Sequence, residues 1–152
     1  MKNESFKKGI KDGIPIGLGY LAVSFTFGMM SVSSGLSIWQ AVLISLTNLT
    51  SAGQFAGLDI IVAGGSYWEM ALTQLVINLR YCLMSFSLSQ KMRRDEPWAH
   101  RYLVAFGITD EIFGVSASQE GKVSAFYNYG AMCMAIPGWT LGTLLGAISG
   151  SL

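Results

Sequence analysis

Three charged residues stand inside otherwise apolar sequence, where an ionised side chain is expensive. Arg80 is the only charged residue between Met70 and Gln90, and Asp110 and Glu111 are adjacent in a second apolar stretch. A charge at the centre of a membrane helix costs about 2.5–3.5 kcal/mol or more unless it is paired. We therefore expect one carboxylate to pair with Arg80, and the other to serve a substrate ammonium, a proton or another chain. In the alternative, both acids lie in water at the membrane interface.

A second group of polar residues could bind a small solute by hydrogen bonds. The ten residues from Ser45 to Gln54 include six polar side chains and a glycine, which is poor material for a continuous helix facing lipid. Interrupted helices in transporters offer backbone N–H and C=O groups to ligands. We predict that Asn48, Ser51 and Gln54 bind substrate, together with Asn78. One kinked span whose serines and threonines bond to their own backbone is the alternative.

The composition is that of a membrane protein. Of 152 residues, 51% are hydrophobic, 12% are charged and 18 are glycine. No charge lies between Asp12 and Asp59 or after Lys122, and runs of this length predict membrane spans. The net charge of +1, without a basic patch outside loops, argues against a nucleic-acid partner. The sequence lacks the motifs of intramembrane aspartyl proteases, so we do not expect the protein to be an enzyme. It also lacks the spacing of metal ligands, and we expect no metal or cofactor. The only histidine, His100, is expected to be a solvated loop residue.

These observations predict an all-α polytopic membrane protein with about four full or broken spanning helices and one re-entrant or discontinuous helical unit. Its single domain, 1–152, is divided in chain order into a basic N-terminus (1–12), a span (13–34), the broken or re-entrant unit (37–66), a span (69–90), a basic loop (91–97), a span with a kink or restart at Gly107–Thr109 (98–119) and a last span (124–151). Thr109 suits a helix N-cap.

The predicted orientation follows from the basic flanks. Lysines before residue 12 and basic residues after residue 90 place both segments in the cytoplasm. The number of crossings between them must then be even, so the 37–66 unit enters and leaves by the same face.

Small residues spaced four apart predict close contacts between helices rather than ligand sites. These residues are Gly13, Gly17, Gly142, Gly146 and Gly150.

Four motifs, in chain order, resemble the AzlC-like branched-chain amino-acid permeases. They are Gly53-Gln54-Phe55, Ile77-Asn78-Leu79-Arg80-Tyr81, Ile108-Thr109-Asp110-Glu111 and the run from Trp139 to Ala147. The resemblance implies an exporter of branched-chain or similar neutral amino acids in a bacterial inner membrane, acting as the large subunit beside a small hydrophobic AzlD-like subunit. Against this family, the chain looks short or truncated, and Tyr81 stands where many relatives have histidine.

A zwitterionic aliphatic amino acid matches the candidate residues. Its carboxylate would meet backbone N–H groups and Gln54, its ammonium would meet Asp110 or Glu111, and its side chain an apolar wall, while Asn78 could bond either end. A titrating carboxylate would couple export to protons. A non-transporting assembly subunit of a larger membrane complex and a small passive channel are the alternative functions, and a second copy of the chain is a further possible partner.

Overall fold

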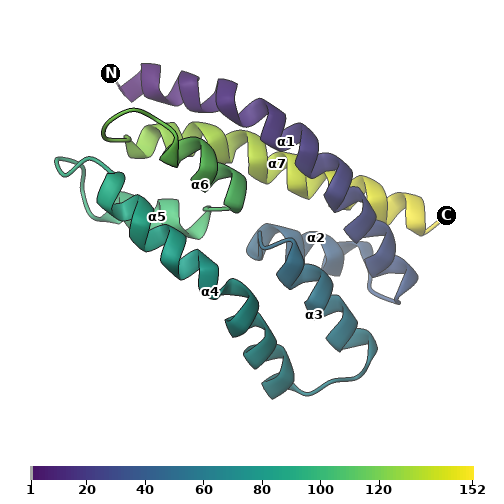
Figure 1. Cartoon of the computed structure of the whole chain (residues 1–152). Coiled ribbons are helices and arrows are strands. Elements are labelled where there is room, and N and C mark those ends of the chain that lie inside the picture. Colours follow the sequence, from purple (N-terminus) through teal and green to yellow (C-terminus); the bar gives the residue numbers. More distant parts are fainter. Residues whose placement is uncertain (1) are drawn as a thin grey trace. The chain divides into compact units, whose positions relative to one another are not determined.

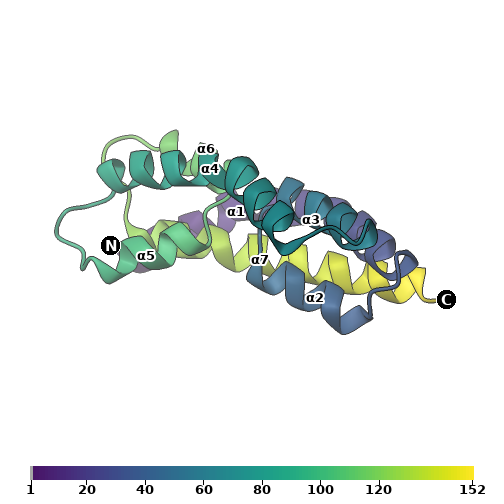
Figure 2. The same ribbon diagram turned by 90° about the horizontal axis from the view of Figure 1, so that it is seen from below.

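The computed structural model describes residues Lys2–Leu152, which form seven α-helices (Figures 1 and 2). In chain order these are α1 (Lys2–Ser33), α2 (Ile38–Thr47), α3 (Ala52–Val62), α4 (Tyr67–Lys91), α5 (Ala99–Phe106), α6 (Asp110–Ala117) and α7 (Ala125–Gly150). Within this described part, α1, α4 and α7 are long and apolar enough to cross a membrane, whereas α2 and α3 are apolar but short. The predicted fold class is confirmed, including its discontinuous unit.

Contacts within the chain divide it into two compact units, and each is described by itself. The first unit consists of Met1–Leu18 and Arg80–Pro137, and the second of Gly19–Leu79 and Gly138–Leu152. Helices α1, α4 and α7 each contribute residues to both units. The first unit also holds the short pair α5 and α6, and the second holds the short pair α2 and α3.

In the first unit, glycines allow α1 and α7 to touch backbone to backbone. A Cβ atom added at Gly13 would lie 2.8 Å from Ala131 Cα, and one at Gly17 would lie 2.6 Å from Met134 O. Both contacts are closer than any side chain permits, so the predicted packing role of these glycines agrees with the structure. A separate apolar core joins α4, α5 and α7 through Leu88, Met92, Val104, Ile108 and Ala125.

In the second unit, the remaining predicted glycines bring α7 against α1. Gly142 lies against Leu21 and Ser24, and Gly146 lies against the carbonyl of Phe25. A Cβ atom at Gly150 would lie 3.1 Å from Met29 Cα, so this contact is looser.

Helix α2 begins at Ile38 because Ser37 and Gln40 form a capping box. Ser37 N donates to Gln40 Oε1 at 2.7 Å, and Gln40 N donates to Ser37 Oγ at 3.3 Å. These bonds satisfy donors that a helix start leaves without partners. After α2 ends, the chain turns back into α3, and Figures 1 and 2 show the two as separate helices.

The segment predicted as one span at 98–119 is two helices of eight residues each, α5 and α6. The interruption falls at Gly107–Thr109, where a kink or restart is predicted. Thr109 Oγ1 accepts a hydrogen bond from Ile112 N at 3.4 Å, which confirms Thr109 as the N-cap of α6. The break is therefore more complete than a kink.

Candidate functional site

Buried polar side chains lie at the break between α2 and α3 in the second unit. Helix α2 ends at Thr47 and α3 begins at Ala52. Among the residues that the structure describes, Ser51 is the only non-glycine residue with positive φ, at +31°. Such a backbone costs on the order of 1–3 kcal/mol and persists where the surrounding structure holds it in place. The contacts around Ser51 must therefore hold the turn in this conformation.

Three buried side chains form a hydrogen-bond chain that joins α2, α3 and α7 within the second unit. Ser45 Oγ and Thr143 Oγ1 share a hydrogen bond of 2.7 Å, and Gln54 Nε2 donates to Ser45 Oγ at 3.0 Å. Ser45 and Thr143 are fully buried, and Gln54 is only 2% exposed. Buried polar groups of this kind must be hydrogen-bonded to be tolerated, so the chain fixes the start of α3 against α2 and α7.

A second hydrogen-bond chain joins the start of α3 to α4. Gln74 Nε2 donates to Gly53 O at 2.7 Å, and Asn78 Nδ2 donates to Gln74 Oε1 at 2.9 Å. A Cβ atom at Gly53 would lie 2.7 Å from Gln74 Oε1 and 3.3 Å from Asn78 Nδ2. A side chain at position 53 would therefore require the ends of Thr50, Gln74 or Asn78 to move.

Two carbonyl oxygens of this amide cluster, which we define as Gln54, Gln74 and Asn78, are left without a partner. Gln54 Oε1 and Asn78 Oδ1 are buried and accept no hydrogen bond from any residue in Lys2–Leu152. An unsatisfied buried polar group costs about 1–3 kcal/mol, and in native proteins such a group calls for an explanation by function or by a bound partner.

All four predicted substrate-binding residues lie in the second unit, at the break or on α4 beside it. Half-buried Asn48 accepts a hydrogen bond from Thr50 Oγ1 at 2.7 Å. Ser51 forms the strained turn, while Gln54 and Asn78 carry the two unsatisfied oxygens. Their binding of a substrate stays a prediction.

Three residues of the region were missed by the sequence analysis as site residues, namely Ser45, Gln74 and Thr143. Gln74 had a usable signal, because it lies one helical turn before Asn78 on the same face of α4. Thr143 had none, since its partner Ser45 is 98 residues away in the sequence.

The first unit contains the ion pair expected from the three charges. Arg80 Nη1 lies 2.7 Å from Asp110 Oδ2, with the two side chains 43% and 45% exposed. Arg80 Nη2 also donates to Tyr81 Oη at 3.3 Å. Asp110 and Glu111 occupy the first turn of α6, where the helix dipole favours negative charge. The role of these groups in proton coupling or substrate binding stays a prediction. Within Lys2–Leu152, no three His, Cys, Asp or Glu side chains are grouped so that they could hold a metal ion.

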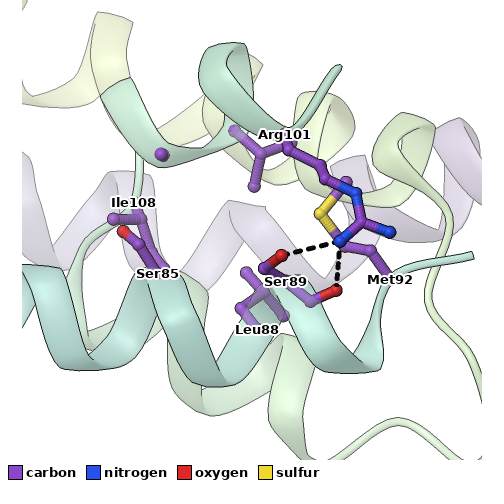
Figure 3. A pocket seen from close by; sticks show the side chains of 8 residues that line it. Ser85, Leu88, Ser89, Met92, Arg101 and Ile108 are labelled. Atoms are coloured by element: carbon purple, nitrogen blue, oxygen red, sulfur yellow. Dashed lines mark hydrogen bonds between the residues drawn. The ribbon is translucent and has the colours of Figure 1, made fainter. Parts of the chain in front are cut away.

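The basic end of the first unit is tied together by arginines. Arg101 Nη1 donates to the carbonyl and the hydroxyl of Ser89 at 2.8 and 2.7 Å, beside a cavity of about 10 Å³ (Figure 3). In the loop after α4, Arg93 holds Asp95 with two hydrogen bonds of 3.1 and 2.8 Å. Hydrogen bonding to this guanidinium lowers the pKa of the Asp95 carboxyl.

His100 differs from its expected state as a solvated loop residue. It lies in the first turn of α5, half-buried, with Nδ1 2.8 Å from Tyr129 Oη. The prediction was wrong because His100 lies on the face of α5 that packs against Tyr129 of α7 in the first unit.

Long apolar helices, interrupted short helices and buried amides define the chain as a polytopic helical membrane protein. A family model described as "AzlC: AzlC protein" matches residues 15–152. The chain belongs to this AzlC family.

Curated relatives agree with this assignment. Inner membrane protein YgaZ of Escherichia coli strain K12 is 31% identical over 97% of this chain and 62% of that protein. An uncharacterized membrane protein of Archaeoglobus fulgidus is 31% identical over 99% of the chain and 65% of its own length. An uncharacterized membrane protein of Helicobacter pylori strain 26695 is 29% identical over 96% of this chain and 66% of its own length. The chain thus spans about two thirds of the length of these relatives. No solved structure matches.

Proposed function

We propose that the chain exports branched-chain or similar neutral amino acids across a bacterial inner membrane, with the solute bound at the break between α2 and α3. The observation that carries this proposal is the buried amide cluster at the break, with two acceptor oxygens that no described residue satisfies. Membership in the AzlC family supports a transport role.

The break suits a solute that carries both signs of charge. The C-terminal end of α2 and the N-terminal end of α3 meet there, and they present opposite ends of the helix dipole. An amino acid carries an ammonium and a carboxylate on one carbon, so it can interact with both helix ends at once. Apolar side chains are close by in the same unit, since the rings of Phe27 and Phe55 pack edge to face at 5.4 Å. An aliphatic side chain would be accommodated against such a surface.

The ion pair of Arg80 and Asp110 supports proton coupling as part of this proposal. Arg80 lies one residue past Leu79, the middle of α4, where charge is costly and tends to be functional. Protonation of Asp110 or of neighbouring Glu111 would weaken the hold on Arg80, and movement of that proton down its electrochemical gradient would supply the energy for export. We expect Asp110→Asn and Glu111→Gln to abolish gradient-driven efflux and to spare exchange. Retention of pH-dependent efflux in both variants would contradict the coupling.

The exposure of α4 supports a partner subunit. In the most apolar stretch of α4 only 6% of the residues are buried, compared with 33% in that of α1 and 44% in that of α7. The half-exposed Arg80 and Asp110 cannot face hydrocarbon cheaply. We propose that a small hydrophobic AzlD-like subunit covers this ion pair, with a second copy of the chain as the other candidate.

Counterflow in proteoliposomes tests the proposed function. Vesicles carrying the chain, alone and with the co-expressed small subunit, are preloaded with leucine, and uptake of labelled leucine, isoleucine and valine is followed. We expect saturable and stereoselective counterflow. We expect Gln54→Met to lower it at least tenfold, because a hydrogen bond to a charged group contributes about 1.5–3 kcal/mol.

Exposed Gln40 provides a control, since Gln40→Met also removes an amide from α2–α3 but leaves the break intact. Non-saturable flux would instead indicate a passive channel. Inertness both alone and with the small subunit would indicate an assembly subunit.

A further inference from the structure

We propose that the amide oxygens of Gln54 and Asn78 bind the ammonium end of the solute, a step that rests on the proposed function. The sequence analysis instead places the carboxylate of the solute at Gln54. The ammonium is favoured because the atoms of the amide cluster without partners, Gln54 Oε1 and Asn78 Oδ1, are oxygens.

The orientation of the Asn78 amide is fixed by its neighbours. Gly53 O can only accept a hydrogen bond, so the contact of 2.7 Å must come from the NH₂ group of Gln74. The oxygen of Gln74 then faces Asn78 at 2.9 Å, and the group that it meets must again be a donor. Asn78 Oδ1 is consequently the atom left over, and it is an acceptor.

Gln54 presents the second acceptor. In the structure its Nε2 donates to Ser45 Oγ at 3.0 Å, and Oε1 has no partner in the described part of the chain. A hydroxyl can both donate and accept, so the neighbours fix the amide orientation of Asn78 but not that of Gln54. At 2% exposure, the side chain is held among protein groups rather than in water. Gln54 follows Gly53 directly in the first turn of α3, and Gly53 is in contact with the Asn78 amide of α4, so the two acceptors come from two helices that meet at Gly53.

Oxygen acceptors distinguish the two ends of an amino acid. A carboxylate has no proton to donate and would be repelled by carbonyl oxygens, whereas an ammonium has three N–H donors. The C-terminal end of α2, at Thr47, adds the negative end of a helix dipole, which favours a cation. Both carboxylates of the second unit, Asp59 and Glu69, are exposed, so the acceptors at the break are neutral and a zwitterion leaves no net charge there.

Three probes separate the ends of the solute in binding measurements on the full chain in lipid nanodiscs. They are leucine, 3-methylbutylamine, which lacks the carboxylate, and 4-methylpentanoate, which lacks the ammonium. We expect Gln54→Glu to bind the amine at least about tenfold more tightly than the wild type and the acid at least about tenfold more weakly. The new carboxylate keeps a hydrogen bond, because the Ser45 hydroxyl can rotate to donate to it.

Controls and second variants keep the outcomes distinct. Gln54→Met should lower the affinity for 3-methylbutylamine about tenfold and change the affinity for 4-methylpentanoate less than twofold. If Gln54→Glu does not fold, this variant tests the proposal by itself. Gln40→Glu adds the same charge at an exposed position of α2 and should change each affinity less than twofold. Tighter acid binding and weaker amine binding by Gln54→Glu, or loss of acid rather than amine binding by Gln54→Met, would overturn the assignment while leaving the proposed function intact.

The same titrations in choline and in sodium buffer test a metal cation as the occupant. Equal amine affinity in both buffers supports an ammonium site, and competition by sodium overturns it. If the wild type binds none of the three probes, either alone or with the co-expressed small subunit, the proposed function fails, and the ammonium assignment with it.

Discussion

Neutralising Arg80 or Asp110 alone should destabilise the protein, and neutralising both should restore most of the loss. A lone charge near the middle of a membrane helix costs about 2.5–3.5 kcal/mol on insertion scales. Because the side chains are 43% and 45% exposed, we discount this by about half, to roughly 1.5 kcal/mol for Arg80→Gln or Asp110→Asn. The double variant should be less destabilised than the sum of the two by about the same amount.

Reversible unfolding in mixed detergent micelles measures this double-mutant cycle. The pair of Lys7 and Glu4 is the control, because its atoms are 3.9 Å apart and its side chains are 66% and 78% exposed. Neutralising these two should give a coupling energy close to zero. Additive effects of Arg80→Gln and Asp110→Asn would refute the argument that the charges compensate each other in the membrane.

Three further changes test other parts of the structure. Ser51→Gly should raise stability by about 0.5–1 kcal/mol in thermal unfolding, because glycine accepts φ of +31° without strain, and a lower melting temperature would contradict the strained turn. Gly146→Leu should abolish the folded fraction in detergent chromatography, because any side chain there meets α1 backbone, whereas Gly19→Ala meets nothing within 4 Å and should behave like the wild type. Arg93→Gln should raise the carboxyl pKa of Asp95 seen by carbon NMR. The stability supplied by this pair is present above the unfolded pKa of Asp95 and is lost as pH falls through its lowered folded pKa, so the variant should lose less stability on acidification than the wild type.

The parts of the fold that follow from local sequence were predictable. Six polar side chains in ten residues placed the break between α2 and α3, and Thr109 followed by two carboxylates placed the start of α6. Glycines spaced four apart marked contacts of α1 with α7. Each of these depends on residues close together in the chain, so helix propensity, capping and small size were sufficient.

The parts that depend on distant residues were not predictable. Nothing local to Ser45 indicates a bond to Thr143, and nothing local to Gly53 indicates that Gln74 reaches its carbonyl. Likewise, the burial of His100 against Tyr129 arises from how α5 packs on α7 in the first unit. Such contacts are set by tertiary packing, to which a pattern in one sequence gives no direct access.

The hydrogen bonds of the break also set an order of biogenesis. Helices α2 and α3, of 10 and 11 residues, are too short to be stable alone. The hydrogen-bond partner of Gly53 O, Gln74, is synthesised 21 residues later, and the partner of Ser45, Thr143, is synthesised 98 residues later. A nascent chain that enters lipid before Gln74 and Thr143 are made would lack these hydrogen-bond partners, so we expect the insertion machinery to shield the hairpin of α2 and α3 until Thr143 has been synthesised.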